Sequence, residues 1–378
     1  MTPACVADYR DAARRRLPRV LFDYIDGGSY AETTLAANVA DLAAIKLRQR
    51  VLKDVSKLSM TTELFGQSLS MPVILSPIGL GGLYARRGET QAARAAASAG
   101  VPFCLSTVGV CSVEEVAAAA PPPWFQLYMI RDRGFMAEIL GRVAAAKSPV
   151  LVFTVDLPIP GARYRDHRNG MVAVTRRQKL TQALDGLAHP AWLWDVHLRG
   201  RPHSLGNIAA AAADLKALPQ FWGWIGRNFD PSVTWNDLDW VRAHWDGPIV
   251  LKGVLDVDDA LEARRLGVDG IVVSNHGGRQ LDGAPSSIAA LPAIAAAVGD
   301  DLTVLMDGGV RSGLDVLKAL ASGAKGCLIG RAWAYALGAA GEAGVAHMLN
   351  ILRQELRMAM SLTGCTDLRT AGRQLLYS

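Results

Sequence analysis

The chain has 378 residues, of which 50% are hydrophobic and 20% charged, and its net charge of +5 is spread along the sequence. This composition predicts a globular protein with a large core, and the charge fits an anionic substrate or an anionic membrane surface, whereas no recognition motif supports binding to nucleic acid. The N-terminal segment lacks the apolar stretch of a secretory signal, and no run of 18 apolar residues predicts a transmembrane helix.

The first segment, residues 1–72, is predicted to be an N-terminal helical cap. Helical patterns occur in LPRVLFDYIDGG and AETTLAANVADLAAI, and a short β segment is expected near IKLRQRVL. From residue 73 onward, short apolar runs that are typical of buried strands begin to alternate with alanine-rich helical stretches.

Eight such apolar runs occur along the chain. They are VILSPIG (73–79), FCLST (103–107), WFQLY (124–128), VLVFTVD (150–156), IVLKGV (249–254), GIVVSN (270–275), TVLMDG (303–308) and GCLIGR (326–331). The helical stretches between them are ETQAARAAASAG, SVEEVAAAA, FMAEILGRVAAA, DVDDALEARRLG, IAALPAIAAAVG and GLDVLKALASG.

This alternation predicts a TIM (β/α)8 barrel. A doubly wound sheet is the alternative, but no GxGxxG follows the first strand. We expect one domain over residues 1–378, with the barrel strands in 73–156 and 249–331 and helices in 332–378.

Residues 157–248 form a long insertion between the fourth and fifth predicted strands. Connections of this length are usually functional or mobile. The insertion holds seven of the nine tryptophans and many basic residues, and WNDLDWVRAHW within it is predicted to be helical. The tryptophans are Trp192, Trp194, Trp222, Trp224, Trp235, Trp240 and Trp245.

Each predicted strand ends in polar or small residues. Active sites of TIM barrels lie at the carboxyl ends of the strands, so this pattern predicts a large polar ligand there. The strand-end residues are Ser76, Pro77, Gly79, Ser106, Thr107, Gln126, Tyr128, Thr154, Asp156, Lys252, Ser274, Asn275, His276, Arg279, Asp307, Gly308, Gly309, Arg311, Gly330 and Arg331.

Four of these strand ends suggest specific chemistry. DGGVRSG and GCLIGR combine glycine and arginine where barrels commonly bind phosphate, although the glycines of the first stretch could merely turn the chain. Lys252 lies in an apolar strand, where it could form a Schiff base, hold an anionic cofactor or close the barrel through an ion pair. His276 is the one histidine at a predicted strand end and is the candidate base, with Asp156 to hold its imidazole.

Two arginines are candidates for binding a substrate carboxylate. Arg279 follows His276 closely, and Arg163 lies in GARYRDHR, where a solvated loop charge is an equal alternative. The cysteines show no CxxC and no ligand-like spacing with histidine, so free thiols in a reducing compartment and no metal site are expected. They are Cys5, Cys104, Cys111, Cys327 and Cys365.

The chain resembles the FMN-dependent α-hydroxy acid dehydrogenases and oxidases in SNHGGRQLDG, TVDLPIPGARYRD, WFQLY and DGGVRSGLDVLKALASGAKGCLIGRAW. DYRDAARRRLP, FDYIDGGSY, LSMPVILSPIGL and LSTVGVCSVEEVA extend the similarity over nearly the whole chain, towards the quinone-linked L-lactate dehydrogenases of bacteria.

The resemblance implies roles for most of the strand-end residues. Lys252 would stabilise the reduced, anionic flavin, in place of a Schiff base. The substrate carboxylate would meet Arg279, Arg163 and Tyr24, the substrate hydroxyl would meet Tyr128, and His276 paired with Asp156 would be the base. FMN would be bound by Pro77, Gly79, Ser106, Gln126, Thr154, Lys252, Ser274, Asp307, Gly308, Gly309, Arg311, Gly330 and Arg331.

The implied activity is oxidation of an L-2-hydroxy acid, with L-lactate to pyruvate expected and the electrons passed to a membrane quinone. The alternatives are an oxidase that uses oxygen, a dehydrogenase for a larger acid such as mandelate, and a flavin-free lyase that uses Lys252. Val108 stands where glycolate oxidases carry an aromatic residue, which predicts a wider pocket. Gly79 stands where oxidases tend to carry alanine, which favours a dehydrogenase.

The resemblance also bears on location and assembly. The matching loop of the family associates with the membrane, so residues 157–248 are expected to make peripheral contact with the cytoplasmic face of the bacterial inner membrane. The alternative is a tryptophan-rich subdomain packed over the barrel mouth. A homotetramer is expected by resemblance.

Overall fold

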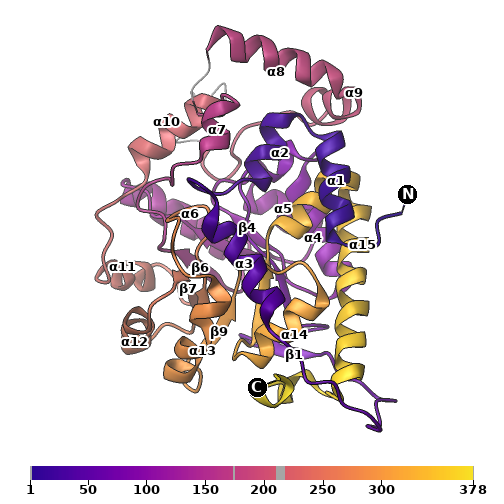
Figure 1. Cartoon of the computed structure of the whole chain (residues 1–378). Coiled ribbons are helices and arrows are strands. Elements are labelled where there is room, and N and C mark those ends of the chain that lie inside the picture. Colours follow the sequence, from indigo (N-terminus) through magenta and orange to yellow (C-terminus); the bar gives the residue numbers. More distant parts are fainter. Residues whose placement is uncertain (1, 173–174, 210–217, 378) are drawn as a thin grey trace.

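The computed structural model describes residues 2–172, 175–209 and 218–377 (Figure 1). Its centre is a closed eight-stranded parallel barrel, with the strand order β3-β10-β9-β8-β7-β6-β5-β4 and a bridge from Leu75 to Phe103 that closes the ring. The TIM-barrel prediction is confirmed. The strands are β3 (Val73–Leu75), β4 (Cys104–Ser106), β5 (Trp124–Leu127), β6 (Leu151–Thr154), β7 (Ile249–Val254), β8 (Gly270–Val273), β9 (Thr303–Met306) and β10 (Gly326–Ile329).

The strands are apolar because helices cover them outside and side chains fill the barrel inside. Nearly every strand residue is buried. The register pairs Thr154 with Lys252 and Lys252 with Val272, so the polar ends of β6 and β7 lie side by side.

Helices follow the strands as predicted, and several begin at a side-chain cap. The hydroxyl of Ser112 accepts from the amide of Glu115, and Ser286 and Ser312 cap their helices in the same way. The helices are α4 (Gly88–Ala99), α5 (Val113–Ala119), α6 (Arg133–Ala145), α12 (Val257–Arg265), α13 (Ser287–Val298) and α14 (Gly313–Ala321).

The chain ends pack together on the barrel. The N-terminal helices are α1 (Val6–Arg16), α2 (Arg19–Asp26) and α3 (Thr33–Ala44), and α1 packs against the long α15 (Arg331–Thr363). Helix α15 starts where β10 ends, bends at Ala340 and Gly341, and runs down one side of the molecule (Figure 1). Two short turns, Leu368–Thr370 and Arg373–Leu375, follow it.

The expected β segment near IKLRQRVL was wrong. This stretch makes one bridge, between Leu47 and Leu376, and its Leu52 is fully exposed, so no neighbouring strand covers it. The N-terminal hairpin lies later, in β1 (Thr62–Leu64) and β2 (Gln67–Leu69), where Phe65 and Gly66 make the tight turn with positive φ.

The insertion splits into an inner and an outer part. Its helices are α7 (Tyr164–Arg168), α8 (Arg176–Ala188), α9 (Pro190–Trp192), a π-helical turn (Leu193–Leu198), α10 (Leu218–Asn228) and α11 (Asp237–Ala243). The expected helix in WNDLDWVRAHW is present as α11. Figure 1 shows α10 and α11 against the barrel, whereas α8 stands out as a separate arm above α2. Residues 173–174 and 210–217 of the insertion lie outside the described part.

The tryptophans of the insertion are mostly packed, as expected for the alternative of a tryptophan-rich subdomain. Trp224 and Trp245 are buried, and of the seven only Trp194 is largely exposed, at 61%. Within the described ranges, no helix combines the length and the apolar character needed to cross a bilayer.

Candidate active site

A cavity lies at the carboxyl ends of the barrel strands and holds about 1080 Å³ of empty space, part of it continuous with solvent. Its walls come from the strand-end loops, α2 and α10. This size suits a cofactor together with a small substrate. The predicted residues that line it are Tyr24, Pro77, Gly79, Tyr128, Thr154, Arg163, Lys252, His276, Arg279, Asp307, Gly308, Gly309, Arg311, Gly330 and Arg331.

Four predicted residues lie behind this lining. Asp156 and Ser274 support residues that do line the cavity: the Ser274 hydroxyl accepts from Nζ of Lys252 and from the amide of His276, each at 3.0 Å. Ser106 donates to Oε1 of Gln126 at 2.9 Å, and both are buried. These contacts hold the cavity wall in one arrangement.

His276 and Asp156 form a hydrogen-bonded pair. Nδ1 of His276 lies 2.9 Å from Oδ1 of Asp156. A carboxylate only accepts, so Nδ1 carries the hydrogen and Nε2 presents a lone pair, 3.4 Å from the Tyr128 hydroxyl. Burial lowers the pKa of His276, and this effect outweighs the charge of Asp156, which raises it. Burial would raise the pKa of Asp156, but the positive charges of His276 and Lys252 hold it below its ordinary value. The imidazole is therefore a neutral base at neutral pH.

The turn after β8 places this base. His276, Gly277 and Gly278 all have positive φ, of 57°, 65° and 73°. A Cβ on Gly278 would lie 2.5 Å from the amide nitrogen of Leu35, and one on Gly277 would lie 2.9 Å from Nη1 of Arg331. The two glycines let the chain turn sharply while α3 and Arg331 pack against it.

Lys252 is a buried cation in a polar wall. Its Nζ lies 3.0 Å from Asp307. Burial alone would lower the pKa of Lys252, but Asp307 and Asp156 raise it above its ordinary value. A protonated lysine is not a nucleophile, which argues against the lyase alternative.

Three buried polar atoms near Lys252 have no hydrogen-bond partner among the described residues. They are Nε2 of Gln126, Oγ1 of Thr154 and Oδ1 of Asp307, on β5, on β6 and after β9. Buried polar groups are normally satisfied, so these atoms point to a ligand that both donates and accepts. The ring edge of a flavin offers such groups, and the expected FMN fits this wall.

Arg279 and Arg163 converge on Tyr24 of α2. Nη1 of Arg279 donates to the carbonyls of Tyr24 and Gly27 at 2.6 and 2.8 Å, and its guanidinium lies 4.8 Å from the centre of the Tyr24 ring. Arg163 is 6% exposed, so the alternative of a solvated loop charge was wrong. Burial and the charge of Arg279 lower the pKa of Arg163. Two cations packed this closely favour an anionic ligand between them.

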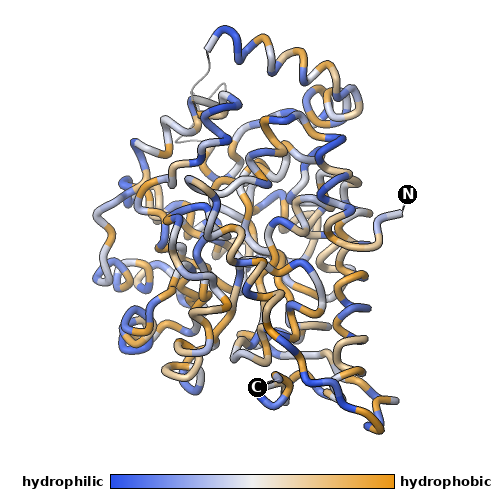
Figure 2. Tube along the Cα trace, in the orientation of Figure 1, coloured by the Kyte–Doolittle hydropathy of each residue, from blue (hydrophilic) through white to orange (hydrophobic). Residues whose placement is uncertain are grey.

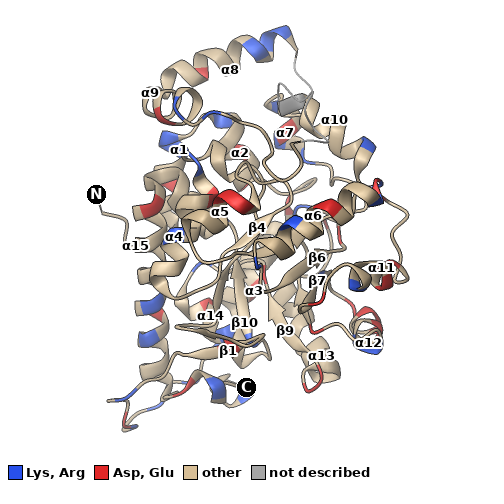
Figure 3. Cartoon of the chain, turned by 180° about the vertical axis from the view of Figure 1, so that it is seen from behind, with Lys and Arg blue, Asp and Glu red and all other residues tan. Residues whose placement is uncertain are grey.

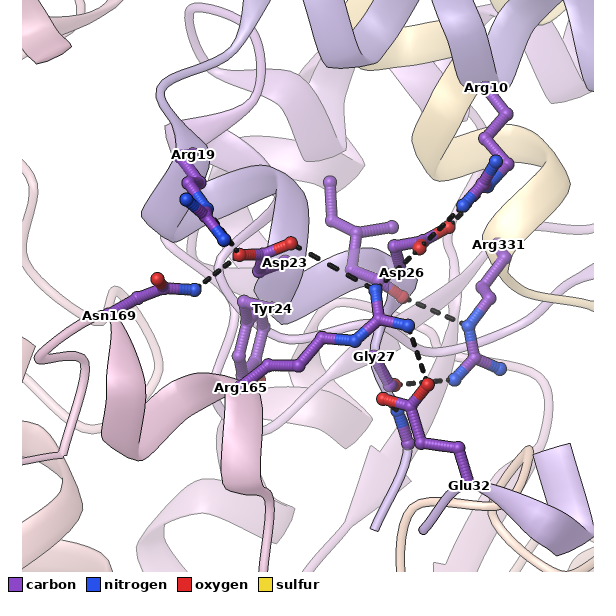
Figure 4. Close-up of polar contacts among 12 residues, drawn as sticks. Arg10, Arg19, Asp23, Tyr24, Asp26, Gly27, Glu32, Arg165, Asn169 and Arg331 are labelled. Carbon is purple, nitrogen blue, oxygen red and sulfur yellow. Dashed lines mark hydrogen bonds and ion pairs between the residues drawn. The ribbon is translucent and has the colours of Figure 1, made fainter. Parts of the chain in front are cut away.

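An ion-pair network holds α2 in place (Figure 4). Asp26 accepts from Arg10 at 2.5 Å and from Arg165 at 2.8 Å. The Tyr335 hydroxyl also donates to Asp26, at 2.7 Å. Burial would raise the pKa of Asp26, but its partners hold it well below the ordinary range. The network ties α1, α7 and α15 to the segment that carries Tyr24.

The two arginines expected at the cofactor phosphate have different surroundings. Arg331 donates from Nε, Nη1 and Nη2 to the carbonyls of Ile25, Gly277 and Gly27, at 3.0, 2.8 and 2.7 Å. Burial lowers its pKa to about 9. The Arg311 side chain donates only to the adjacent carbonyl of Val310 among its described contacts. Arg331 therefore mainly anchors the cap, and Arg311 is the better candidate for a phosphate.

The side of the cavity opposite the barrel, which α10 forms, was not predicted from the sequence. Phe221, Trp222 and Ile225 of α10, with Phe229 just after it, line the cavity opposite the barrel. The ring of Trp222 lies 5.2 Å from the guanidinium of Arg163, and its buried Nε1 has no partner among the described residues. The apolar spacing of α10 was a signal for a packed helix, but not for what it packs against.

Gly79 and Val108 are in close contact. A Cβ on Gly79 would lie 2.8 Å from Cγ2 of Val108. The two departures from glycolate oxidases noted in the sequence are thus neighbours in the same wall. In the part of the chain that the structure describes, no group of three potential metal ligands occurs.

Comparison with known proteins shows the family of the chain. Residues 13–378 match the family model described as FMN-dependent dehydrogenase. An L-lactate dehydrogenase of Caulobacter sp. (strain K31) is 60% identical over 378 residues, which covers 100% of this chain and 99% of that protein. One from Chromohalobacter salexigens is 58% identical over 372 residues, covering 98% and 94%.

Solved structures give the same fold. The monotopic membrane protein (S)-mandelate dehydrogenase superposes with a TM-score of 0.93 at 34% identity, and both chains are covered completely. A mandelate oxidase superposes with a TM-score of 0.84 at 40% identity, covering 100% of this chain and 98% of that one.

Proposed function

Because the chain belongs to the FMN-dependent dehydrogenase family, we propose that it oxidises L-lactate to pyruvate and delivers the electrons to a membrane quinone. The cofactor is FMN. The observation that supports the reaction most directly is the pairing of a neutral base, His276, with a two-arginine anion site in one cavity. A small 2-hydroxy acid presents one carboxylate and one hydroxyl, which are the two groups that this arrangement matches.

Arg279 and Arg163 bind the substrate carboxylate. Tyr24 and Gly27 hold Nη1 of Arg279 through their carbonyls, which leaves the N–H groups on the other edge of the guanidinium to the substrate. Charge-assisted bonds from a planar guanidinium fix the direction of a carboxylate as well as its position. The substrate C2 carbon is thereby held beside His276.

His276 removes a proton from the substrate through Nε2. Asp156 keeps the hydrogen on Nδ1 and stabilises the positive charge that develops on the imidazole. Tyr128, whose pKa is raised by burial, keeps its hydrogen and donates to the substrate oxygen. When bound at this wall, FMN would supply the acceptor for the two electrons that the substrate loses. The cationic Lys252 places a positive charge at the buried end of the cavity and favours added negative charge there.

The insertion supports peripheral contact with a membrane. On α8, Leu180 and Leu184 lie one turn apart on one face and are 63% and 59% exposed. Figure 2 shows apolar and polar residues alternating along this helix, and Figure 3 shows cations at its start, which are Arg176 and Arg177. An arm with exposed leucines and nearby cations suits an anionic bilayer surface. We place this contact at the cytoplasmic face of the inner membrane.

A substrate and acceptor screen of the purified holoenzyme tests the proposal. We expect turnover of L-lactate with ferricyanide and with decylubiquinone, and little peroxide in air. Peroxide formation at a matching rate would show an oxidase, and a higher kcat/KM for mandelate would show the larger substrate, which the likeness to the two mandelate enzymes makes the second candidate. A colourless protein that borohydride inactivates with pyruvate would instead support the lyase.

A further inference from the structure

A second cavity lies under α8, and nothing in the reaction described so far uses it. It holds about 1760 Å³ of empty space, part of it continuous with solvent, between α8, α2, the turn at Gly81–Leu83 and the π-helical turn. We call it the α8 cavity. Its apolar lining includes Leu21, Leu80, Leu83, Trp192, Leu205 and Phe221.

The α8 cavity is a neighbour of the active-site cavity. Phe221 lines both. The segment after β3 also separates them, because residues 76–79 line the active-site cavity whereas Leu80 and Leu83 line the α8 cavity. A ligand in the α8 cavity is therefore separated from the redox site by one layer of side chains.

The α8 cavity also adjoins the surface proposed to meet the membrane. Its outer wall is the inner face of α8, with Gln182, Ala183, Gly186 and Leu187, while Leu180 and Leu184 do not line the cavity and lie on the exposed side of the same helix. A lipophilic molecule leaving a bilayer at this arm would thus enter an apolar space instead of water.

Polar groups at the α8 cavity suit a ligand whose oxygen atoms accept hydrogen bonds when it is oxidised and donate them when it is reduced. Nε2 of His203 lies 3.1 Å from the carbonyl of His197, so it carries the hydrogen, and Nδ1 is an acceptor without a partner among the described residues. Burial lowers the pKa of His203, which keeps the ring neutral. Lys179 lines the same cavity and offers a donor. A quinone carbonyl needs a donor, and the hydroxyl formed on its reduction needs an acceptor.

We propose that the α8 cavity binds the ring of the membrane quinone that reoxidises the enzyme. The inference rests on the proposed function, which supplies the two electrons. Electrons and protons balance in the overall reaction, because the hydroxy acid loses two electrons and two protons and the quinone takes up two of each to become the quinol. Leu80 and Phe221 lie between the two cavities. The quinone and the hydroxy acid can therefore each bind without displacing FMN.

Filling the α8 cavity tests the proposal. A Cβ on Gly186 would have nothing within 4 Å, so Gly186→Trp places an indole in open space on the cavity side of α8. Gly141→Trp on α6 is the matched control, because Gly141 is also helical with nothing within 4 Å and lines none of the cavities described. The readout is the ratio of decylubiquinone to ferricyanide turnover with L-lactate, which corrects for any loss of folded holoenzyme.

We expect this ratio to fall at least about tenfold in Gly186→Trp and to stay at the wild-type value in Gly141→Trp. An azidoquinone photolabel on the wild-type protein should mark peptides of α8 or residues 80–83. An unchanged ratio with labelling elsewhere would overturn the site while leaving the proposed function intact. A wild-type enzyme that uses ferricyanide but no quinone would remove the quinone step of the proposed function, and the site with it.

Discussion

Asp156 and His276 are 120 residues apart in the chain, yet Oδ1 of one lies 2.9 Å from Nδ1 of the other. Asp156 follows β6 and His276 follows β8, so the barrel alone brings them together. Oδ2 of Asp156 is buried without a partner among the described residues, which concentrates its acceptor strength on the imidazole.

Asp156→Asn should abolish most of the turnover while FMN stays bound. The neutral amide neither fixes the Nδ1–H tautomer nor stabilises the imidazolium, so we expect kcat to fall at least about 100-fold, as for loss of a general base. Turnover with ferricyanide and the flavin absorbance of the purified protein check this. His276→Gln should show a comparable loss, and near-wild-type kcat in either variant would contradict the assignment.

The acid limb of kcat/KM should report His276. Only the neutral imidazole accepts a proton, and burial lowers its pKa, so activity should be constant at neutral pH and fall as the pH drops through a value below 6.5. The charge of Asp156 raises the pKa of His276, so Asp156→Asn should move the limb to still lower pH. A limb above 6.5 in the wild type would be inconsistent with this environment.

Arg279→Lys should weaken substrate binding far more than FMN binding. Lysine keeps the charge but cannot donate to the carbonyls of Tyr24 and Gly27 and to a carboxylate in one plane. Loss of one charge-assisted bond predicts a rise in the KM for lactate of about tenfold to 100-fold. Arg311→Lys is the matched control, with the opposite pattern expected: weaker FMN retention and little change in KM. Equal effects of the two variants would contradict this division.

The barrel was predictable because its signals are local. Each strand is an apolar run buried on both sides, most of the following helices begin at a side-chain cap, and Gly277 and Gly278 indicate the turn after β8. The strand-end rule then brought together residues from all eight strands. Thirteen of the fifteen predicted residues that line the cavity follow from this one rule, whereas Tyr24 and Arg163 do not lie at strand ends.

The parts that were missed depend on contacts between distant segments. The local sequence of α10 does not predict that Trp222 packs on Arg163. The sequence around Arg331 likewise does not predict that its guanidinium donates to the carbonyls of Ile25 in α2 and of Gly27. The exposed leucines of α8 were overlooked because the tryptophans dominated the composition of the insertion. The homotetramer stays a prediction.

Trp222 should limit the size of the substrate. Its ring closes the cavity beside Arg163, so Trp222→Ala should open space there and raise the ratio of mandelate to lactate kcat/KM at least about tenfold. Trp222→Phe keeps most of the ring but removes the unpaired N–H, so a rise in the KM for lactate without a change in this ratio is expected. Trp240→Phe on α11, which stacks on His244 and lines none of the cavities described, is the control. An unchanged ratio in Trp222→Ala would show that α10 does not set specificity.

The exposed leucines of α8 should carry membrane binding. Leu180→Glu combined with Leu184→Glu removes apolar area and adds negative charge facing an anionic surface, so we expect the fraction bound to anionic phospholipid vesicles to fall more than about tenfold. Turnover of lactate with ferricyanide should be retained, because neither side chain lines the active-site cavity. The control is Val51→Glu with Leu52→Glu, which places the same charges on residues that are even more exposed and lie away from the insertion. If both double variants lose binding equally, the effect is one of net charge, and α8 is not the membrane contact.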